Sequence, residues 1–167
     1  SLLKIFVKFF ISNKVTVKNN EMILNLNLTN PIDREIYLKG EYEKQQIEFL
    51  SEQIKKHEIK FFLDIGAHMG FYSINMSKKD ISIHSFEPAK QNFEQLKKNK
   101  DLNDKNNIFL HNIALSDEKK KIKMWVPDEN RTGGFSIYDT NDEEIKKYEE
   151  KKTFKIESKS NLGDNII

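Results

Sequence analysis

The chain has 167 residues, which fits one domain of the usual size, roughly 100–200 residues, and suffices to bury a real core. It contains no cysteine, and this excludes a disulfide framework, thiolate metal sites and thiol nucleophiles. Lys and Arg number 28 against 26 Asp and Glu, so the formal net charge is only +2. That balance predicts no nucleic-acid partner, because phosphate binding draws on a surplus of basic side chains.

The most apolar stretch, residues 2–11, lies near the start of the chain. Two lysines interrupt it, and it is shorter than the roughly 20 residues of a membrane-spanning helix. We expect it to pack on the domain, with a helix on a membrane surface as the alternative, and we predict a cytoplasmic chain without stable membrane insertion. Because the chain begins at Ser1 and ends with Ile166 and Ile167, we expect both ends to be cuts in a longer reading frame.

The N-terminal residues predict a β-hairpin followed by a helix. Apolar and polar residues alternate over 14–28, with the turn dipeptide Asn19–Asn20 in the middle. Asn30–Pro31 then predicts a break. After it, apolar residues recur at helical spacing over 41–57, which predicts a surface helix.

The middle third alternates between strand and helix patterns. The apolar run Phe61–Leu63, with Ile59 just before it, predicts a strand that is covered on both faces. Further strands are expected at 81–86 and 108–113, with helices over 71–78 and from Ala89 onward. Such alternation predicts an α/β fold whose strands are parallel and joined by right-handed crossovers.

The last third predicts a different, hairpin-like insertion. Strand patterns cover 121–126 and 153–157, and Thr132–Gly134 predicts a turn between them. The charged run 142–151 is expected to be a solvated helix or loop.

A loop with two glycines and a carboxylate together predict a ligand-binding site. The sequence Asp-Ile-Gly-Ala-His-Met-Gly, from Asp64 to Gly70, comes directly after the first predicted parallel strand. Glu87 follows the second strand, 17 residues after Gly70. Ligands of open α/β sheets bind outside the carboxyl ends of the strands. There, Gly66 and Gly70 would let a ligand lie against bare backbone, and Glu87 could accept both hydroxyls of a ribose.

The spacing of the glycines in the loop distinguishes between the possible cofactors. A dinucleotide fingerprint needs a glycine where His68 stands, and a phosphate-binding P-loop needs Lys-Ser/Thr where Phe71–Tyr72 stand. An acidic strand end beside a glycine loop suits a ligand with cationic groups near a carboxylate, such as S-adenosylmethionine (SAM), which carries no phosphate. Two other interpretations stay open: Asp64 could cap the next helix, and Glu87 could be a surface carboxylate.

Three sequence blocks carry a resemblance to a known family. They are Phe62–Ser73, Phe86–Pro88 and Asn112–Asp117. Together they resemble the FkbM family of SAM-dependent methyltransferases, and weaker similarity extends to Gly134–Ser136 and Asn161–Asp164. The loop of that family usually has Asn where this chain has His68, so position 68 is a departure.

The resemblance implies a Rossmann-like class I methyltransferase fold of three layers with a parallel central sheet, and SAM as the cofactor. It also implies that the loop walls the methionine part of SAM, that Glu87 holds the ribose and that Asn112 meets the adenine. The candidate cofactor-binding residues are Asp64, Gly66, Ala67, His68, Gly70, Phe71, Glu87, Pro88, Asn112 and Ala114.

The resemblance further implies that the chain is a fragment. The family has another acidic strand end, which this sequence lacks, so we expect residues 41–167 to be the N-terminal part of the domain and residues 1–40 to be an extension. In a sheet ordered 3-2-1-4-5-6 the cofactor lies between strands one and four. We therefore expect the chain alone to bind SAM poorly or to fold incompletely, and its activity as an enzyme by itself is left open.

The implied reaction is O-methylation of a hydroxyl on a sugar, polysaccharide or secondary metabolite, with a small-molecule or glycan acceptor. Such an acceptor needs a base, for which Asp117 is the residue considered, and no catalytic residue is assigned. No metal site is expected, since His57, His84 and His111 are scattered. Two alternatives remain open: a nucleotide- or NAD-binding enzyme of the same architecture, and a non-catalytic interaction domain.

Overall fold

The computed structural model of the chain describes residues 13–19, 21–116, 121–126, 136–137 and 154–162, and after residue 116 it describes the backbone alone. Several predictions lie outside the described residues: those for residues 2–11, the turn at 132–134, the charged run 142–151 and Asp117.

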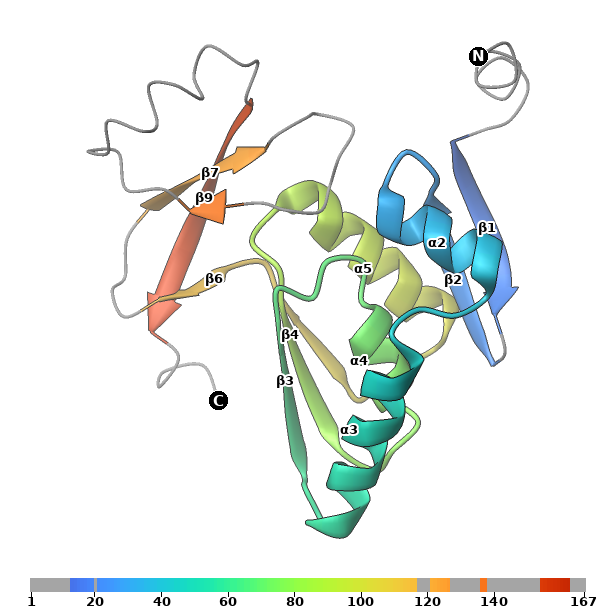
Figure 1. Cartoon of the computed structure of the whole chain (residues 1–167). Helices are drawn as coiled ribbons and strands as arrows, with labels where there is room; N and C mark the ends of the chain where they lie inside the picture. Colours follow the sequence, from blue (N-terminus) through green and yellow to red (C-terminus); the bar gives the residue numbers. More distant parts are fainter. Residues whose placement is uncertain (1–12, 20, 117–120, 127–135, 138–153, 163–167) are drawn as a thin grey trace, which may run out of the picture.

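A β-hairpin forms the N-terminal part of the described chain (Figure 1). It consists of β1 (Lys14–Asn19) and β2 (Met22–Asn27), which pair antiparallel with Asn19 opposite Met22. This confirms the hairpin expected from the alternating pattern. On β2, the side chains of Met22, Leu24 and Leu26 are exposed by only 4%, 0% and 0%. One face of the hairpin therefore belongs to the hydrophobic core.

A helix follows where the sequence predicted only a break. Helix α2 (Pro31–Lys39) begins at the Asn30–Pro31 dipeptide itself. Asn30 is the N-cap, because its side-chain oxygen accepts a hydrogen bond from the Ile32 N–H at 3.0 Å, and Pro31 stands in the first turn. Asn followed by Pro is a helix start as well as a turn signal, and the prediction missed this helix.

The centre of the molecule is a three-stranded parallel sheet (Figure 1). Its strands, in the spatial order β3-β4-β5, are β3 (Phe61–Ile65), β4 (Ser82–Phe86) and β5 (Ile108–His111). The helices around it are α3 (Lys44–Lys56), α4 (Phe71–Met76) and α5 (Lys90–Leu102). Because α4 and α5 connect successive strands, the predicted α/β fold with parallel strands is confirmed.

One face of the sheet is buried under the helices and the hairpin. Ile83 of β4 and Ile108 of β5 are almost completely buried and share one core with Ile74 of α4. Helix α5 lies between the sheet and the hairpin (Figure 1). It contacts β2 through a side-chain amide, because Asn99 Oδ1 accepts a hydrogen bond from the Asn25 N–H at 2.6 Å. Hairpin, helices and sheet thus form one packed unit.

The opposite face of the sheet is left open by the described residues. Phe61, Leu63 and Ile65 of β3 and Phe109 of β5 are exposed by 58%, 40%, 63% and 47%. The expectation that the first parallel strand is covered on both faces is therefore wrong for the described part of the chain. An unbroken apolar run makes both faces of a strand apolar, but it does not supply the elements that cover them. The described residues contain no third layer of the expected fold.

Two histidines meet on this open face. His84 Nδ1 lies 3.1 Å from His111 Nε2, and the two rings stack with their centroids 5.3 Å apart. Phe109 stacks on His84 at 5.0 Å, and Phe86 stacks on His111 at 4.5 Å. Burial, together with the neighbouring His84, lowers the pKa of His111 below its ordinary value. The register of β4 and β5 produces this contact, which the scattered positions did not predict.

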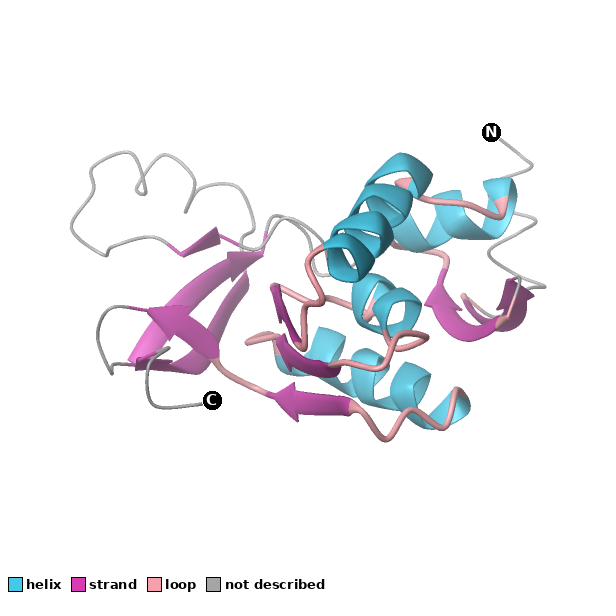
Figure 2. Cartoon of the chain, turned by 90° about the horizontal axis from the view of Figure 1, so that it is seen from below, coloured by secondary structure: helices cyan, strands magenta, loops and turns pink. Residues whose placement is uncertain are grey.

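The last described strands form a second sheet beside the first (Figures 1 and 2). They are β6 (Ala114–Ser116), β7 (Lys121–Val126), β8 (Ser136–Ile137) and β9 (Phe154–Leu162), in the order β6-β9-β7-β8. The strands predicted at 121–126 and 153–157 are confirmed, whereas β5 ends at residue 111 and β6 was not predicted. Among the described helices, none is long and apolar enough to cross a membrane.

Candidate functional site

The loop from Gly66 to Gly70 folds over the carboxyl ends of β3 and β4. The backbone N–H groups of Gly66 and Ala67 both donate to the Phe86 carbonyl oxygen, at 2.9 and 3.0 Å. Asn99 of α5 donates from Nδ2 to the Met69 carbonyl oxygen at 3.0 Å. The loop is therefore held by the end of β4 and by helix α5.

Every second residue of the loop, starting at Gly66, has a backbone conformation in the left-handed region. Gly66, His68 and Gly70 have φ angles of 80°, 51° and 88°. Glycine adopts this region without steric cost, whereas a residue with a Cβ rarely does, and Asn, Asp and His are the side chains found there most often. A histidine at position 68 is thus compatible with this backbone conformation.

The two glycines have different surroundings. Gly66 is exposed, and a Cβ built on it would meet no atom within 4 Å. Gly70 is buried, and a Cβ there would lie 2.3 Å from Leu96 Cδ1 of α5. Open backbone, against which a ligand could lie, is therefore found at Gly66. The missing side chain of Gly70 makes room for helix packing, which differs from the expectation that both glycines face a ligand.

Glu87 follows β4, and its carboxylate lies against the glycine loop. The side chain is buried, with 4% of the residue exposed. Its Oε2 accepts a hydrogen bond from the His68 N–H at 2.8 Å, and its Oε1 accepts one from the Ala89 N–H at 2.8 Å. Burial raises the pKa of Glu87, and the hydrogen bonds from Ala89, His68 and Asn92 oppose this rise. A carboxylate has about four acceptor positions, and the hydrogen bonds from these three described residues use about three of them.

Asp64 at the end of β3 holds the following helix. Its Oδ2 accepts hydrogen bonds from the Ser73 N–H at 3.0 Å and from the Ser73 hydroxyl. Ser73 Oγ also lies 2.6 Å from Ser85 Oγ of β4. Burial raises the pKa of Asp64, and the bonds from Ser73 oppose the rise. The helix-capping interpretation of Asp64 therefore has a clear geometric basis.

Of the remaining candidate residues, Asn112 links two strand ends, whereas Phe71 and Ala114 are buried. Asn112 donates from Nδ2 to the carbonyl oxygens of Glu87 at 2.8 Å and Pro88 at 3.3 Å, which ties the end of β5 to the end of β4. Phe71 is buried and packs edge-on against the Tyr42 ring, with centroids 5.7 Å apart, so its side chain belongs to the core. Ala114, also buried, begins the second sheet.

A contact that the sequence did not predict joins the loop to the start of α2. His68 Nε2 lies 2.9 Å from Asn30 Nδ2, although the two residues are 38 positions apart. The side chain of His68 thus points to the start of α2, while its backbone N–H points to Glu87. The only sequence signal at Asn30 was the dipeptide with Pro31, and that signal carries no information about a distant partner.

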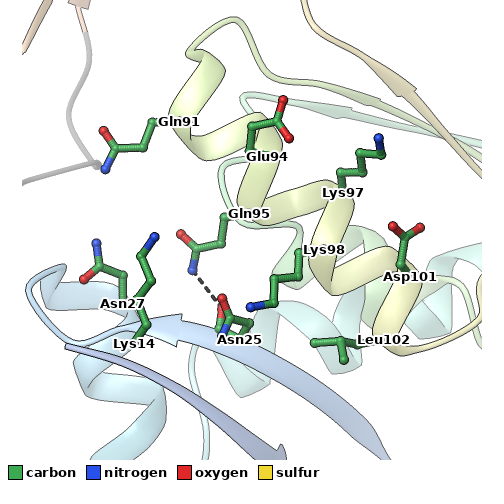
Figure 3. Close-up of a pocket in the computed structure, with 10 residues that line it drawn as sticks. All are labelled: Lys14, Asn25, Asn27, Gln91, Glu94, Gln95, Lys97, Lys98, Asp101 and Leu102. Atoms are coloured by element: carbon green, nitrogen blue, oxygen red, sulfur yellow. Dashed lines mark hydrogen bonds between the residues drawn. The ribbon is translucent and has the colours of Figure 1, made fainter. Parts of the chain in front are cut away.

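A polar groove of about 620 Å³ lies elsewhere, between the hairpin and α5 (Figure 3). Its lining residues are Lys14, Asn25, Asn27, Gln91, Glu94, Gln95, Lys97, Lys98, Asp101 and Leu102. Gln95 donates from Nε2 to the Asn25 carbonyl oxygen at 2.9 Å and to Asp33 Oδ2 at 2.6 Å. No residue of the glycine loop lines the groove, so it is separate from the candidate site.

Comparison with known proteins identifies the fold. No family model and no curated protein sequence matches the chain. Among solved structures, it is similar to the SAM-dependent methyltransferase from Agrobacterium tumefaciens, with a TM-score of 0.50 and 11% identity over 64% of this chain and 34% of that one. It is also similar to M. jannaschii TYW2 in complex with AdoMet, with a TM-score of 0.44 and 16% identity over 62% of this chain and 44% of that one.

The chain therefore spans less than half the length of either solved structure. The likeness to the Agrobacterium structure shows that the matched part of this chain has a Rossmann-like α/β fold.

Proposed function

We propose that this chain binds SAM at the glycine loop and Glu87, and that it forms the SAM-binding part of a methyltransferase. One observation carries the proposal. The open backbone at Gly66 and the buried carboxylate of Glu87 converge at the carboxyl ends of β3 and β4, where Glu87 Oε2 accepts the His68 N–H at 2.8 Å. Ligands of open α/β sheets bind at this edge.

The chemistry of these residues fits SAM. Glu87 offers an acceptor for a ribose hydroxyl, and its remaining capacity suits one such bond in addition to those from Ala89, His68 and Asn92. The exposed Gly66 leaves room for the methionine part, whose walls would be Asp64 and Ala67. No Lys or Arg stands between Asp64 and Gly70, so the ammonium and sulfonium groups of SAM meet no positive side chain of the loop. When bound, SAM supplies the methyl group on its sulfonium.

The finer assignment rests on the resemblance to the FkbM family. On that basis the acceptor is a hydroxyl of a sugar, polysaccharide or secondary metabolite, and Asn112 meets the adenine. Alignment of acceptor and methyl group supplies several kcal/mol of rate enhancement in such displacements. The near-neutral charge, +2, supports a small-molecule or glycan acceptor over a nucleic acid.

Titration of the chain with SAM, followed by NMR because the expected affinity is low, tests the proposal through Glu87. The variant Glu87→Gln keeps the shape of the side chain but removes its charge. We expect it to bind SAM about 10- to 100-fold more weakly, as for loss of a charged hydrogen-bond acceptor. The control Glu94→Gln changes an exposed carboxylate on α5, remote in sequence from the loop, and should bind SAM like the unaltered chain. Circular dichroism melting confirms that each variant is folded.

Two outcomes would contradict the proposal. Equal SAM affinity in the Glu87→Gln and Glu94→Gln variants would remove Glu87 from the site, as expected of an interaction domain with this fold. Tight binding of NADH by the unaltered chain, with no binding of SAM, would identify a nicotinamide-binding enzyme instead.

A further inference from the structure

A buried asparagine outside the loop contacts the proposed cofactor site. Asn30 is exposed by 0% and lies between β2 and α2. Its N–H donates to the Asn27 carbonyl oxygen at 2.9 Å, and its carbonyl oxygen accepts from the Arg34 N–H at 3.0 Å. These backbone bonds fix Asn30 in place, and its side chain reaches His68 of the glycine loop.

The orientation of the Asn30 amide follows from its second contact. Asn30 Oδ1 accepts a hydrogen bond from the Ile32 N–H at 3.0 Å, as the N-cap of α2. The amide nitrogen is therefore the atom that faces His68 Nε2 at 2.9 Å. Because Nδ2 is a donor, His68 Nε2 is the acceptor of this hydrogen bond.

His68 has a backbone that needs such support. Its φ of 51° lies in the left-handed region, which is unfavourable for residues with a Cβ. In this conformation its N–H donates to Glu87 Oε2 at 2.8 Å. A ring fixed at Nε2 resists rotation of the backbone to which it is attached. The chain of contacts therefore runs from Asn30, through His68, to the carboxylate proposed to hold the ribose.

We infer that Asn30 is a positioning residue for the cofactor site: by holding the His68 ring it keeps the loop amide on Glu87. The inference rests on the proposed function for its link to SAM. It also gives the hairpin and α2 a role in the site. Asp33 of α2 is held to this unit, because its Oδ2 accepts hydrogen bonds from the Asn27 N–H at 2.7 Å and from Gln95 Nε2 at 2.6 Å.

The variant Asn30→Ser separates positioning from helix capping. Serine caps a helix about as well as asparagine, but it lacks the nitrogen that contacts His68. In the ligand-free chain we expect amide hydrogen exchange at His68 to become about three- to tenfold faster, as for loss of one hydrogen bond, while the melting temperature stays close to that of the unaltered chain. The affinity for SAM should fall by a similar factor.

A second variant shows whether Asn30 acts through His68. In a His68→Ala background, Asn30→Ser should have no further effect on SAM affinity. An equal effect in both backgrounds would overturn the inference, because Asn30 would then act through α2 alone. Unchanged exchange at His68 in Asn30→Ser would overturn it whatever the affinity. Faster exchange in a chain that never binds SAM would refute the proposed function but leave the coupling between Asn30 and the loop established.

Discussion

Gly66 and Gly70 share a left-handed backbone, with φ angles of 80° and 88°, but only Gly70 is enclosed. A Cβ at Gly70 would lie 2.3 Å from Leu96 Cδ1, so Gly70→Ala combines backbone strain with overpacking. We expect it to lower the free energy of unfolding by about 3 kcal/mol. Gly66→Ala carries the backbone strain alone and should cost about 1 kcal/mol.

Urea denaturation of both variants measures these values. If Gly66→Ala destabilised the chain as much as Gly70→Ala, the contact between Gly70 and Leu96 would have no energetic weight.

Asp33 makes the stability of the chain depend on pH. It is buried, with 0% exposed, and its Oδ1 has no hydrogen-bond partner within the described part of the chain. Burial raises its pKa, against the opposing effects of Asn27, Gln95 and His68. The folded state therefore binds the proton more tightly than the unfolded chain. Its contribution to stability is full below the ordinary Asp pKa of about 4 and is lost as the pH rises through the folded-state pKa.

The variant Asp33→Asn should reduce this dependence, because the amide carries no charge to bury. Urea denaturation from about pH 4 to pH 7 is expected to show a smaller decline in the free energy of unfolding than in the unaltered chain. Parallel declines in the two proteins would show that Asp33 does not cause the effect.

At the scale of single residues, the positions of Gly66 and Glu87 at the strand ends could be predicted, but the contacts around them could not. The spacing of Gly66, Gly70 and Glu87 indicated a ligand site at the strand ends, and the structure brings Gly66 and Glu87 to one edge of the sheet. The contact of His68 with Asn30 depends on how α2 packs against the loop. No local pattern in the sequence contains that information.

The elements differ in how far their sequences determine them. The period-two pattern of the hairpin and the strand–helix alternation predicted β1 to β5 because each burial pattern has a local period. Helix α2 was missed because Asn30–Pro31 is both a turn signal and a helix start. The covering of β3 was mispredicted because an apolar strand does not specify what packs on each of its faces.

The open face of the sheet predicts a difference between two isoleucines. Ile65 of β3 is exposed by 63%, whereas Ile83 of β4 on the covered face is exposed by 0%. Ile65→Thr should leave the free energy of unfolding within about 0.5 kcal/mol and reduce self-association of the chain. Ile83→Thr should cost about 2–4 kcal/mol, since it places a hydroxyl in the core.

Denaturation and sedimentation velocity measure both effects. A similar loss of stability in the two variants would mean that the face carrying Ile65 is covered in solution.

On the scale of the whole molecule, the hairpin, helices α2 to α5 and the three-stranded sheet form one packed unit. The hairpin contributes Leu24 and Leu26 to the same core as Ile83 and Ile108. The chain spans 34% of the Agrobacterium structure, with which it shares its fold. The described residues contain two parts of the proposed site, the loop after β3 and the carboxylate after β4.

An NMR titration of the ¹⁵N-labelled chain with SAM tests the proposed site most directly, because it detects binding even when the affinity is low. We expect the amide signals of Gly66, Ala67 and His68 to shift together along one binding curve. The amides of Asn25 and Gln95, beside the groove of Figure 3, should stay unchanged. Shifts at the groove with a silent glycine loop would contradict the central claim that SAM binds between Gly66 and Glu87.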